Sequence, residues 1–531
     1  MRSTRPWLPL LLLALLAGGR PAPAAAPPRW NVLFVFADDL GRYGSCYRGV
    51  DGRTGLNDVV STPGFDRLAR EGVLFRHAFV SAPSCTPCRS ALFAGRPFFA
   101  CGRGSILRGA LWDGSLPAFP LLMEESGYRI GKAYKVWGPG TPADAPCGGR
   151  RHAFESAGRR PNDFSEHATA LVAEGATVAA ARAAIVAEAR ANVAAFLADV
   201  PPDRPWFFLF GPTTTHRSWI PGSGRALWGI DPDALRGRLP GFLPDVPEVR
   251  EDVADYLGEV QAVDAYVTAL VDLLEETGHL DDTLVVLSGD HGMPGVPHGK
   301  CDLYDHGTAV PLLVRVPGGR GGRIIDDFVS LPDLMPTFLD VAGVPVPGGV
   351  SARTLLPLLT TDADGQIDPE RTWVVTGRER HVDTARAGNL PYPMRGLRTR
   401  DHLYVRNFAP DRWPMGDPAP DPPDAQRLAT DTFATFADMD AGPTKAWLVL
   451  HRDDPRWRAD YARAVGRRPA EELYDLRRDP DQLVNVATDP AYAETRRELA
   501  DRLEAALVAA GDPRMLPDPV FERPPFTDVA R

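Results

Sequence analysis

Five short apolar runs rich in β-branched and aromatic residues limit the folds open to this chain. Stretches with helical periodicity lie between several of them, notably at 179–198 and 256–274. Runs of this length and composition are typical of buried strands, and strands that alternate with helices predict an α/β sandwich around a mostly parallel sheet. Active-site loops then gather at the carboxyl ends of the strands. The predicted strands are 31–38, 73–80, 205–211, 283–290 and 310–317.

The pattern changes after about residue 345, where shorter segments with strand character predict an antiparallel sheet. A stretch rich in proline and aspartate at 409–424 predicts a loop, and 494–507 predicts an amphipathic helix. At 531 residues the chain is longer than one ordinary core supports. We therefore expect a large domain at 27–345 and a smaller α+β domain at 346–531.

The first residues have the order of a secretory signal. Arg2 and Arg5 precede an apolar run at 7–17, and small residues follow as far as Ala26. A charged segment, an apolar segment and a small-residue cleavage site in this order predict a signal peptide at 1–26. The apolar run is short for a membrane span, although an uncleaved anchor is the alternative. We expect an exported soluble protein, periplasmic or secreted, or lysosomal in a eukaryote.

The charge balance argues against nucleic-acid binding. The formal net charge is −10, so a polyanionic partner would have to meet a local basic pocket. In a chain that uses arginine so heavily, a retained lysine indicates a place that requires a compact ammonium. We expect no nucleic-acid partner, and no membrane partner once the signal is removed. Four of the 59 basic residues are lysines: Lys132, Lys135, Lys300 and Lys445.

Acidic side chains follow two of the predicted strands. Asp38 and Asp39 end the first, and Asp290 and His291 end the fourth. Adjacent carboxylates repel one another unless a cation or a proton intervenes. Each pair alone is also typical of a solvated turn, but two such strand ends in one sheet predict a divalent-cation site. Three carboxylates favour a hard ion, Ca²⁺ or Mg²⁺.

The segment "SCTPCRSALFAGRP" at 84–97 admits several interpretations. Cys85 and Cys88 have the spacing of a redox pair or of half a zinc site, but no second pair of ligands shows a matching spacing. Cys85 also follows a strand and precedes a predicted helix, whose free N–H groups and dipole favour anions. Arg89 adds a cation beside that helix start. The six cysteines define no disulfide framework.

Residues 85–89, Cys-Thr-Pro-Cys-Arg, resemble the Cys-x-Pro-x-Arg signature of type I sulfatases. "NVLFVFADDLG" and "LVVLSGDHG" are similar to the two metal-binding strands of that family, and "EELYDLRRDPDQLVNVATDP" to its closing segment. The similarity covers nearly all of the chain after the signal, in the family's order. "GKCDLYDHGTAVPLLVRVPG" and "PYPMRGLRTRDHLYVRN" most resemble the N-sulfoglucosamine sulfohydrolase (sulfamidase) branch. The resemblance implies an alkaline-phosphatase-like fold whose larger domain is catalytic.

In that family the first cysteine of the signature becomes formylglycine, the nucleophile, through a formylglycine-generating or sulfatase-maturating enzyme. The resemblance implies that Cys85 is the converted residue and that Arg89 supports its hydrate. It also implies that Lys135 and Lys300 contact sulfate, with Lys132 as the competing alignment for Lys135. The implied cation, usually calcium, is bound by residue 85 together with Asp38, Asp39, Asp290 and His291.

One position departs from the family pattern. Trp137 stands where many of these enzymes have a histidine, two residues after the active-site lysine. His216 is then the best remaining general acid or sulfate ligand, although a lone histidine beside an aromatic is more often a structural hydrogen-bonding residue. Four residues of the second domain form either a pocket for an anionic sugar or charges on a strand surface: Glu379, Arg380, His381 and Arg395.

These assignments predict a hydrolase of sulfate esters or sulfamates, with a sulfated saccharide as partner. Glucosamine N-sulfate of heparan-type glycans is the favoured substrate. An O-sulfatase for another glycan or for an aryl or alkyl sulfate is an alternative, because Trp137 changes the leaving-group side. A catalytically silent glycan-binding homologue would keep Cys85 unconverted, free or joined to Cys88. We expect Lys132 and Lys445 at the surface.

Overall fold

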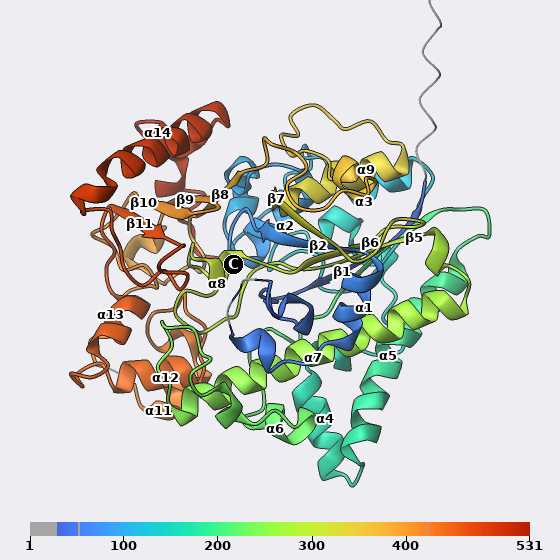
Figure 1. The fold of residues 1–531 in the computed structure, drawn as a ribbon, viewed down its shortest axis with the longest axis horizontal. Helices are drawn as coiled ribbons and strands as arrows, with labels where there is room; N and C mark the ends of the chain where they lie inside the picture. Colours follow the sequence, from blue (N-terminus) through green and yellow to red (C-terminus); the bar gives the residue numbers. More distant parts are fainter. Residues whose placement is uncertain (1–28, 51, 53, 422, 531) are drawn as a thin grey trace, which may run out of the picture.

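A seven-stranded sheet runs through the larger part of the molecule, and a four-stranded sheet lies at one end of it (Figure 1). The computed structural model describes residues 29–530 except positions 51, 53 and 422. Among the described strands of the large sheet, only β6 runs antiparallel to its neighbours. In spatial order these strands are β3 (Arg129–Tyr134), β4 (Trp206–Gly211), β1 (Asn31–Ala37), β5 (Thr283–Gly289), β6 (Leu312–Arg315), β2 (Val73–Phe79) and β7 (Arg323–Ser330).

Helices cover both faces of the large sheet because its central strands are apolar on both sides. In β1, alternate side chains enter opposite cores: Leu33 and Val35 pack on one face, Phe34 and Phe36 on the other. The first face is covered by α1 (Pro63–Glu71), α4 (Phe164–Ala173), α5 (Val178–Asp199), α6 (Ser223–Trp228) and α7 (Pro247–Glu276). The second is covered by α2 (Cys85–Ala94), α3 (Phe119–Glu125), α9 (Leu334–Ala342) and α10 (Leu356–Leu359).

The smaller sheet is antiparallel throughout and is built from the last third of the chain. Its strands, in spatial order, are β11 (Glu471–Asp475), β10 (His402–Asn407), β9 (Met394–Thr399) and β8 (Trp373–Arg378). α14 (Ala493–Ala509) packs on it through Leu499, Leu503 and Leu507. Three more helices gather around a separate apolar cluster: α11 (Ala425–Thr430), α12 (Pro443–Leu450) and α13 (Arg458–Val465).

The predicted α/β sandwich with a second, antiparallel sheet is confirmed. The strands β3 and β7 were not anticipated, and both are edge strands that carry charged residues within "RIGKAY" and "RIIDDFVS". The domain boundary near residue 345 stays a prediction, and the signal predicted at 1–26 lies outside the described residues. Within the described part of the chain, every helix is too short or too polar to cross a bilayer.

Candidate active site

The candidate site lies where β1 and β5 end. The two strands pair in parallel with Ala37 opposite Gly289, so the residues that follow leave the sheet side by side. The Asp39 N–H donates to Asp290 Oδ1 at 2.8 Å. Gly289 is required because a Cβ there would lie 1.9 Å from Leu40 O. The chain after β1 therefore crosses directly over the end of β5 and brings the two acidic strand ends together.

Four side chains with ligand atoms meet at this edge, each at most 1% exposed: Asp38, Asp39, Asp290 and His291. Ligand atoms of Asp39, His291 and Cys85 lie within 4.8 Å of one another. Ligand atoms of Asp38, Asp290 and Cys85 do so as well. Carboxylate oxygens with one imidazole are a donor set that suits a hard divalent cation. The residues present therefore fit a cation site.

Cys85 opens α2 and faces this cluster. Its Sγ lies 3.3 Å from His291 Nε2 and 3.8 Å from Asp39 Oδ1. Cys88 instead packs in the core on the second face of the large sheet. All six cysteines, which lie within the described residues, are free thiols. The Cys-x-x-Cys spacing therefore corresponds to no disulfide in this structure.

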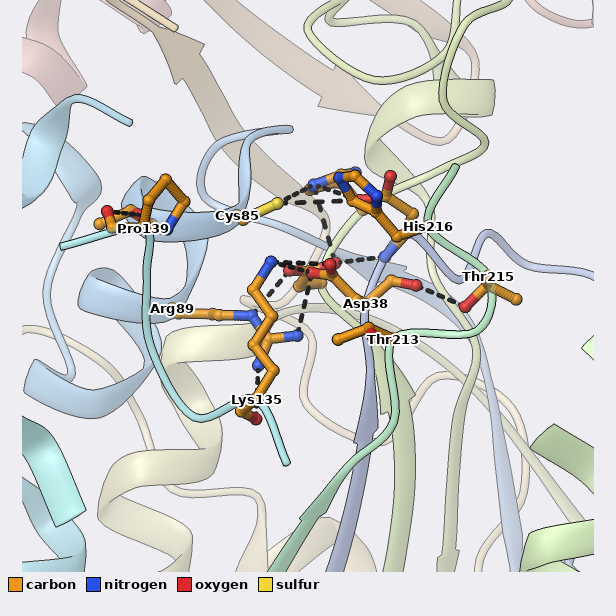
Figure 2. Close-up of polar contacts among 12 residues, drawn as sticks. Asp38, Cys85, Arg89, Lys135, Pro139, Thr213, Thr215 and His216 are labelled. Atoms are coloured by element: carbon orange, nitrogen blue, oxygen red, sulfur yellow. Dashed lines mark hydrogen bonds and ion pairs between the residues drawn. The ribbon is translucent and has the colours of Figure 1, made fainter. Parts of the chain in front are cut away.

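Three basic side chains contact the carboxylates of this cluster, and Figure 2 shows two of them, Arg89 and Lys135, beside Asp38. Arg89 Nε donates to Asp290 Oδ2 at 2.8 Å, and its Nη2 lies 3.3 Å from Asp38 Oδ1. Lys135 Nζ lies 2.6 and 2.7 Å from the two oxygens of Asp38. On the other side of the cluster, Lys300 Nζ donates to a carboxylate oxygen of Asp39 at 3.0 Å. The structure thus brings all three predicted sulfate-site cations to the acidic strand ends.

Burial and the neighbouring cations shift the pKa values of these carboxyl groups in opposite directions. Burial by itself would raise the pKa of Asp38, but Lys135 and Arg89 hold that pKa well below its usual value. For Asp290, burial dominates and raises the pKa. A buried carboxylate with a raised pKa indicates a place that additional positive charge would stabilise. The raised pKa of Asp290 therefore agrees with the cation site that the ligand atoms indicate.

His216 lies in the loop after β4, at the rim of the acidic cluster. One of its ring nitrogens lies within 4.8 Å of ligand oxygens of Asp38 and Asp39, as Figure 2 shows from the side of Lys135. Trp137 makes a buried structural contact instead: its Nε1 donates to Ser90 Oγ at 2.7 Å, and only 4% of its surface is exposed. An indole N–H cannot serve as a titrating acid, so within the described site His216 remains the candidate.

A cleft of about 810 Å³ adjoins the cluster. Lys135 forms part of its wall and is 17% exposed at the side chain. Trp137, Arg150 and Thr213 line it further out. Of the site residues, Lys135 is the one that lines this cleft, and its ammonium reaches Asp38 at the edge of the acidic cluster.

Of the four residues predicted from the second domain, only His381 reaches the helix that carries Cys85. Its Nδ1 lies 2.8 Å from Ser84 Oγ, and burial lowers the pKa of the imidazole to about 3, so the ring is neutral. Glu379 instead accepts from Arg395 Nη2 at 2.8 Å and from Arg514 Nε at 2.9 Å.

Arg395 and Arg380 are likewise bound within the protein. Arg395 Nε donates to Asp512 Oδ2 at 2.5 Å. Arg380 donates to the backbone oxygens of Asp528 and Arg108, both at 2.7 Å. Together with the partners of Glu379, these contacts favour the alternative interpretation of these charges as structural.

Two lysine predictions were wrong. Lys132 is 3% exposed, and Lys445 is fully buried, whereas both were expected at the surface. Lys132 pairs with Asp144 at 2.6 Å and with Glu155 at 3.4 Å. Its ammonium is therefore engaged by these two carboxylates and not by Asp38, the partner of Lys135.

One residue at the site was not anticipated. Asp440, in the loop before α12, lies 3.2 Å from Lys300 Nζ through Oδ2. Its segment, "FADMDAGPTK" at 436–445, shows no strand or helix pattern in the sequence and is loop up to the start of α12 at Pro443. The only signal was the rare lysine at its end, Lys445.

A family model decides the assignment: the one described as sulfatase matches residues 30–344. The chain belongs to the sulfatase family. A second model, described as N-sulphoglucosamine sulphohydrolase, C-terminal, matches residues 289–435 of this sulfatase. It is 30% identical to human N-sulphoglucosamine sulphohydrolase, over 94% of this chain and 93% of that protein. This sulfatase is therefore an enzyme of the class that hydrolyses sulfate esters or sulfamates.

Other relatives of this sulfatase share the family more distantly. It is 23% identical to an N-acetylglucosamine-6-O-sulfatase of Bacteroides thetaiotaomicron, over 78% of this chain and 85% of that one. A solved structure described as a complex with its substrate D-glucosamine-2-N,6-O-disulfate matches with a TM-score of 0.61 at 17% identity. It covers 93% of this sulfatase and 99% of the solved chain. That likeness confirms the fold.

Proposed function

We propose that this sulfatase removes sulfate from sulfated sugars, with glucosamine N-sulfate of heparan-type glycans as the favoured substrate. The observation that carries the proposal is the meeting of Cys85, three cations and the acidic strand ends at one edge of the large sheet. The choice of sugar rests on the 30% identity to human N-sulphoglucosamine sulphohydrolase and on the match of the C-terminal model.

Conversion of Cys85 to formylglycine is part of the proposal. Burial raises the pKa of the Cys85 thiol well above its usual value, and a protonated thiol is a poor nucleophile. A hydrated aldehyde at the same position would present oxygen instead of sulfur. The proposal therefore requires a formylglycine-generating or sulfatase-maturating enzyme as a partner before or during export to the periplasm, the extracellular space or the lysosome.

The residues that would hold the cation, Ca²⁺ with Mg²⁺ as the alternative, are residue 85 and the four buried ligands at the strand ends. A bound divalent cation would supply positive charge beside the nucleophile and lower the pKa of its hydroxyl. The four ligands are Asp38, Asp39, Asp290 and His291.

The reaction would proceed in two steps carried by residue 85. One hydroxyl of the hydrate would give its proton to a neighbouring carboxylate and attack sulfur in line, so that the S–N or S–O bond to the sugar breaks while Arg89, Lys135 and Lys300 neutralise the sulfate oxygens. His216 would protonate the departing nitrogen or oxygen of the sugar. The second hydroxyl would then lose its proton to water, the C–O bond to sulfate would break with release of sulfate, and the restored aldehyde would take up water to form the hydrate again. A serine in this place would lack that exit.

A second candidate is an O-sulfatase, favoured by Trp137. Because this indole is held by Ser90, the leaving group meets one histidine, His216, where many sulfatases have two. A panel of N-, 2-O- and 6-O-sulfated saccharides separates the two functions. Fastest release from an O-sulfate would overturn the sulfamidase assignment and leave the sulfatase assignment intact.

The deciding experiment is mass spectrometry of the peptide that spans Cys85, from protein made in its natural host. We expect formylglycine at position 85 and no sulfate release by Cys85→Ala, with unchanged thermal unfolding. An intact thiol or a Cys85–Cys88 disulfide in the natural protein would contradict the enzyme proposal and favour a silent glycan-binding homologue. Cys88→Ala is the matched control and should remain active.

A further inference from the structure

Lys300 is held between two carboxylates on opposite sides. Asp39 Oδ2 lies 3.0 Å from its Nζ, and Asp440 Oδ2 lies 3.2 Å from the same atom. The side chain of Asp39 is fully buried, that of Lys300 is 3% exposed and that of Asp440 is 15% exposed. The ammonium therefore lies between the acidic cluster at the strand ends and a carboxylate from a loop of the C-terminal part of the chain.

This arrangement fixes the direction of a flexible side chain. A lysine ammonium has three N–H donors on a four-carbon stem. Asp39 accepts one of them at 3.0 Å, and Asp440 attracts the ammonium as an ion-pair partner at 3.2 Å, which leaves N–H donors for a further acceptor. Without Asp440, the attraction of Asp39 would draw Lys300 toward the carboxylates of the cluster, and the ammonium would no longer be held between the two acids.

The segment that carries Asp440 is anchored independently of Lys300. Lys445 Nζ donates to the backbone oxygens of Thr432, Phe436 and Met439, at 3.1, 3.3 and 2.6 Å. The last of these oxygens belongs to the residue directly before Asp440. A buried ammonium that binds three carbonyls of one loop fixes the course of that loop.

Two further contacts tie the segment to the site. Asp438 binds Arg378 and Arg386 and accepts the backbone N–H of Val382 at 3.1 Å. At Gly295, whose φ is 73°, a Cβ would lie 2.9 Å from Asp440 O, so this glycine allows the loop before Lys300 to approach the segment. These contacts fix the loop that places Asp440 beside Lys300.

We propose that Asp440 is a positioning residue that holds Lys300 in place for the sulfate group. The proposal rests on the proposed function for its activity readout. Asp440 acts through Lys300, which faces the sulfate and not the sugar. Its loss should therefore affect all sulfated substrates alike.

Binding of inorganic sulfate tests the proposal without turnover. Calorimetric titration should show Asp440→Ala binding sulfate about 5- to 10-fold more weakly than wild type, although it has lost a repelling negative charge. Asp440→Asn keeps an oxygen that accepts from Lys300 and should lie between the two. If Asp440 were only a neighbouring charge, both variants would bind sulfate more tightly, and that result would overturn the proposal.

Turnover supplies the second test. We expect kcat/KM of Asp440→Ala to fall about 10- to 100-fold for every substrate that the wild type hydrolyses, as for other outer-shell partners, and Asp440→Glu to recover part of it. Asp453→Asn, at an exposed aspartate with 87% of its side chain accessible, is the matched control and should not change. Unchanged turnover in Asp440→Ala, or a loss confined to one sugar, would overturn the proposal.

The two proposals fail in distinguishable ways. A wild-type protein that releases no sulfate from any substrate contradicts the proposed function, and the sulfate titration then decides the role of Asp440 alone. An active wild type with unaffected Asp440 variants contradicts only the role of Asp440. Thermal unfolding within about 2 °C of wild type in Asp440→Asn would show that its effects are local.

Discussion

The charged side chains at this site nearly cancel. Buried Arg89 and Lys300 and the partly exposed Lys135 face three buried carboxylates at the strand ends, and Asp440 adds a fourth carboxylate beside Lys300. With this balance, the protein groups alone provide little net attraction for an anion. A divalent cation in the cluster would leave the lysines in excess and make the site favourable for sulfate.

Lys132 in β3 and Lys135 directly after that strand allow a matched comparison at the residue scale. Lys135 contacts Asp38, whereas Lys132, three residues earlier in the same strand region, pairs with Asp144 and Glu155. We expect Lys135→Ala to lower kcat/KM for sulfate release by about 100-fold or more, the usual effect of removing one group that stabilises transition-state charge. Lys132→Ala should lower the melting temperature while kcat/KM stays within about tenfold. Equal losses of turnover in both variants would contradict the role of Lys135.

Residues adjacent to strong local motifs could be predicted from the sequence, and residues delivered by distant loops could not. Asp38 and Asp290 follow apolar strands, and Cys85 precedes a helix, so their meeting follows from parallel strands that end at one edge. Asp440 reaches the site through a loop held by Lys445. That contact depends on how the two halves pack, and no periodicity in the sequence records it.

At the scale of elements, the loop at 435–442, directly before α12, is a part of the C-terminal region that reaches the site. Burial lowers the pKa of Lys445 to about 8, so below that pH it is the ammonium that its three carbonyl partners require. Replacement by an apolar side chain of similar length would remove this donor from the carbonyls of Thr432 and Met439, at a cost of about 1–3 kcal/mol, whereas Phe436 O would keep the backbone N–H of Met439.

We therefore expect Lys445→Met to unfold at lower urea concentration and to bind inorganic sulfate as weakly as Asp440→Ala. Equilibrium urea unfolding and calorimetric titration measure the two effects. Arg456→Met, at a side chain that is 76% exposed, should change neither. A destabilised Lys445→Met that binds sulfate like the wild type would show that the loop does not place Asp440.

The central strands of the large sheet could be predicted from the sequence, and the edge strands could not. Central strands such as β1 and β5 are apolar on both faces because helices cover both sides, and their boundaries were predicted to within about one residue. The edge strands β3 and β7 contain charged residues and no continuous apolar run. Each pairs with a neighbouring strand on one side only, and an edge position is compatible with charged side chains.

At the scale of the molecule, α7 connects the core to the active-site loop. Arg217, next to His216, forms a two-pronged ion pair with Asp252 of this helix at 2.8 and 2.7 Å. One turn further along, Asp255 accepts the backbone N–H groups of Gly222 and Gly224. The acidic face of α7 therefore supports the loop that carries the candidate general acid, and the charge state of that face bears on the stability of the whole fold.

Three buried acids on α7 predict how that stability depends on pH. Burial raises the pKa of Asp255, Glu259 and Asp264 to about 7 each. In the unfolded chain these groups titrate near pH 4. The folded state therefore holds more protons between pH 4 and 7, so their contribution to stability is complete below about pH 4 and is lost as pH rises through 7.

We expect the melting temperature to fall between pH 5 and pH 8, and Glu259→Gln to flatten that fall. For Glu259 alone the effect across the full window is on the order of 3 kcal/mol, because one pKa unit corresponds to about 1.4 kcal/mol. Differential scanning fluorimetry at closely spaced pH values measures it. Glu248→Gln, at an exposed residue in the first turn of α7, is the control and should keep the wild-type slope. A Glu259→Gln protein with the wild-type slope would mean that Glu259 is already ionised at pH 5, and the acidic face of α7 would then be held by ion pairs and hydrogen bonds to carboxylates instead of by bound protons.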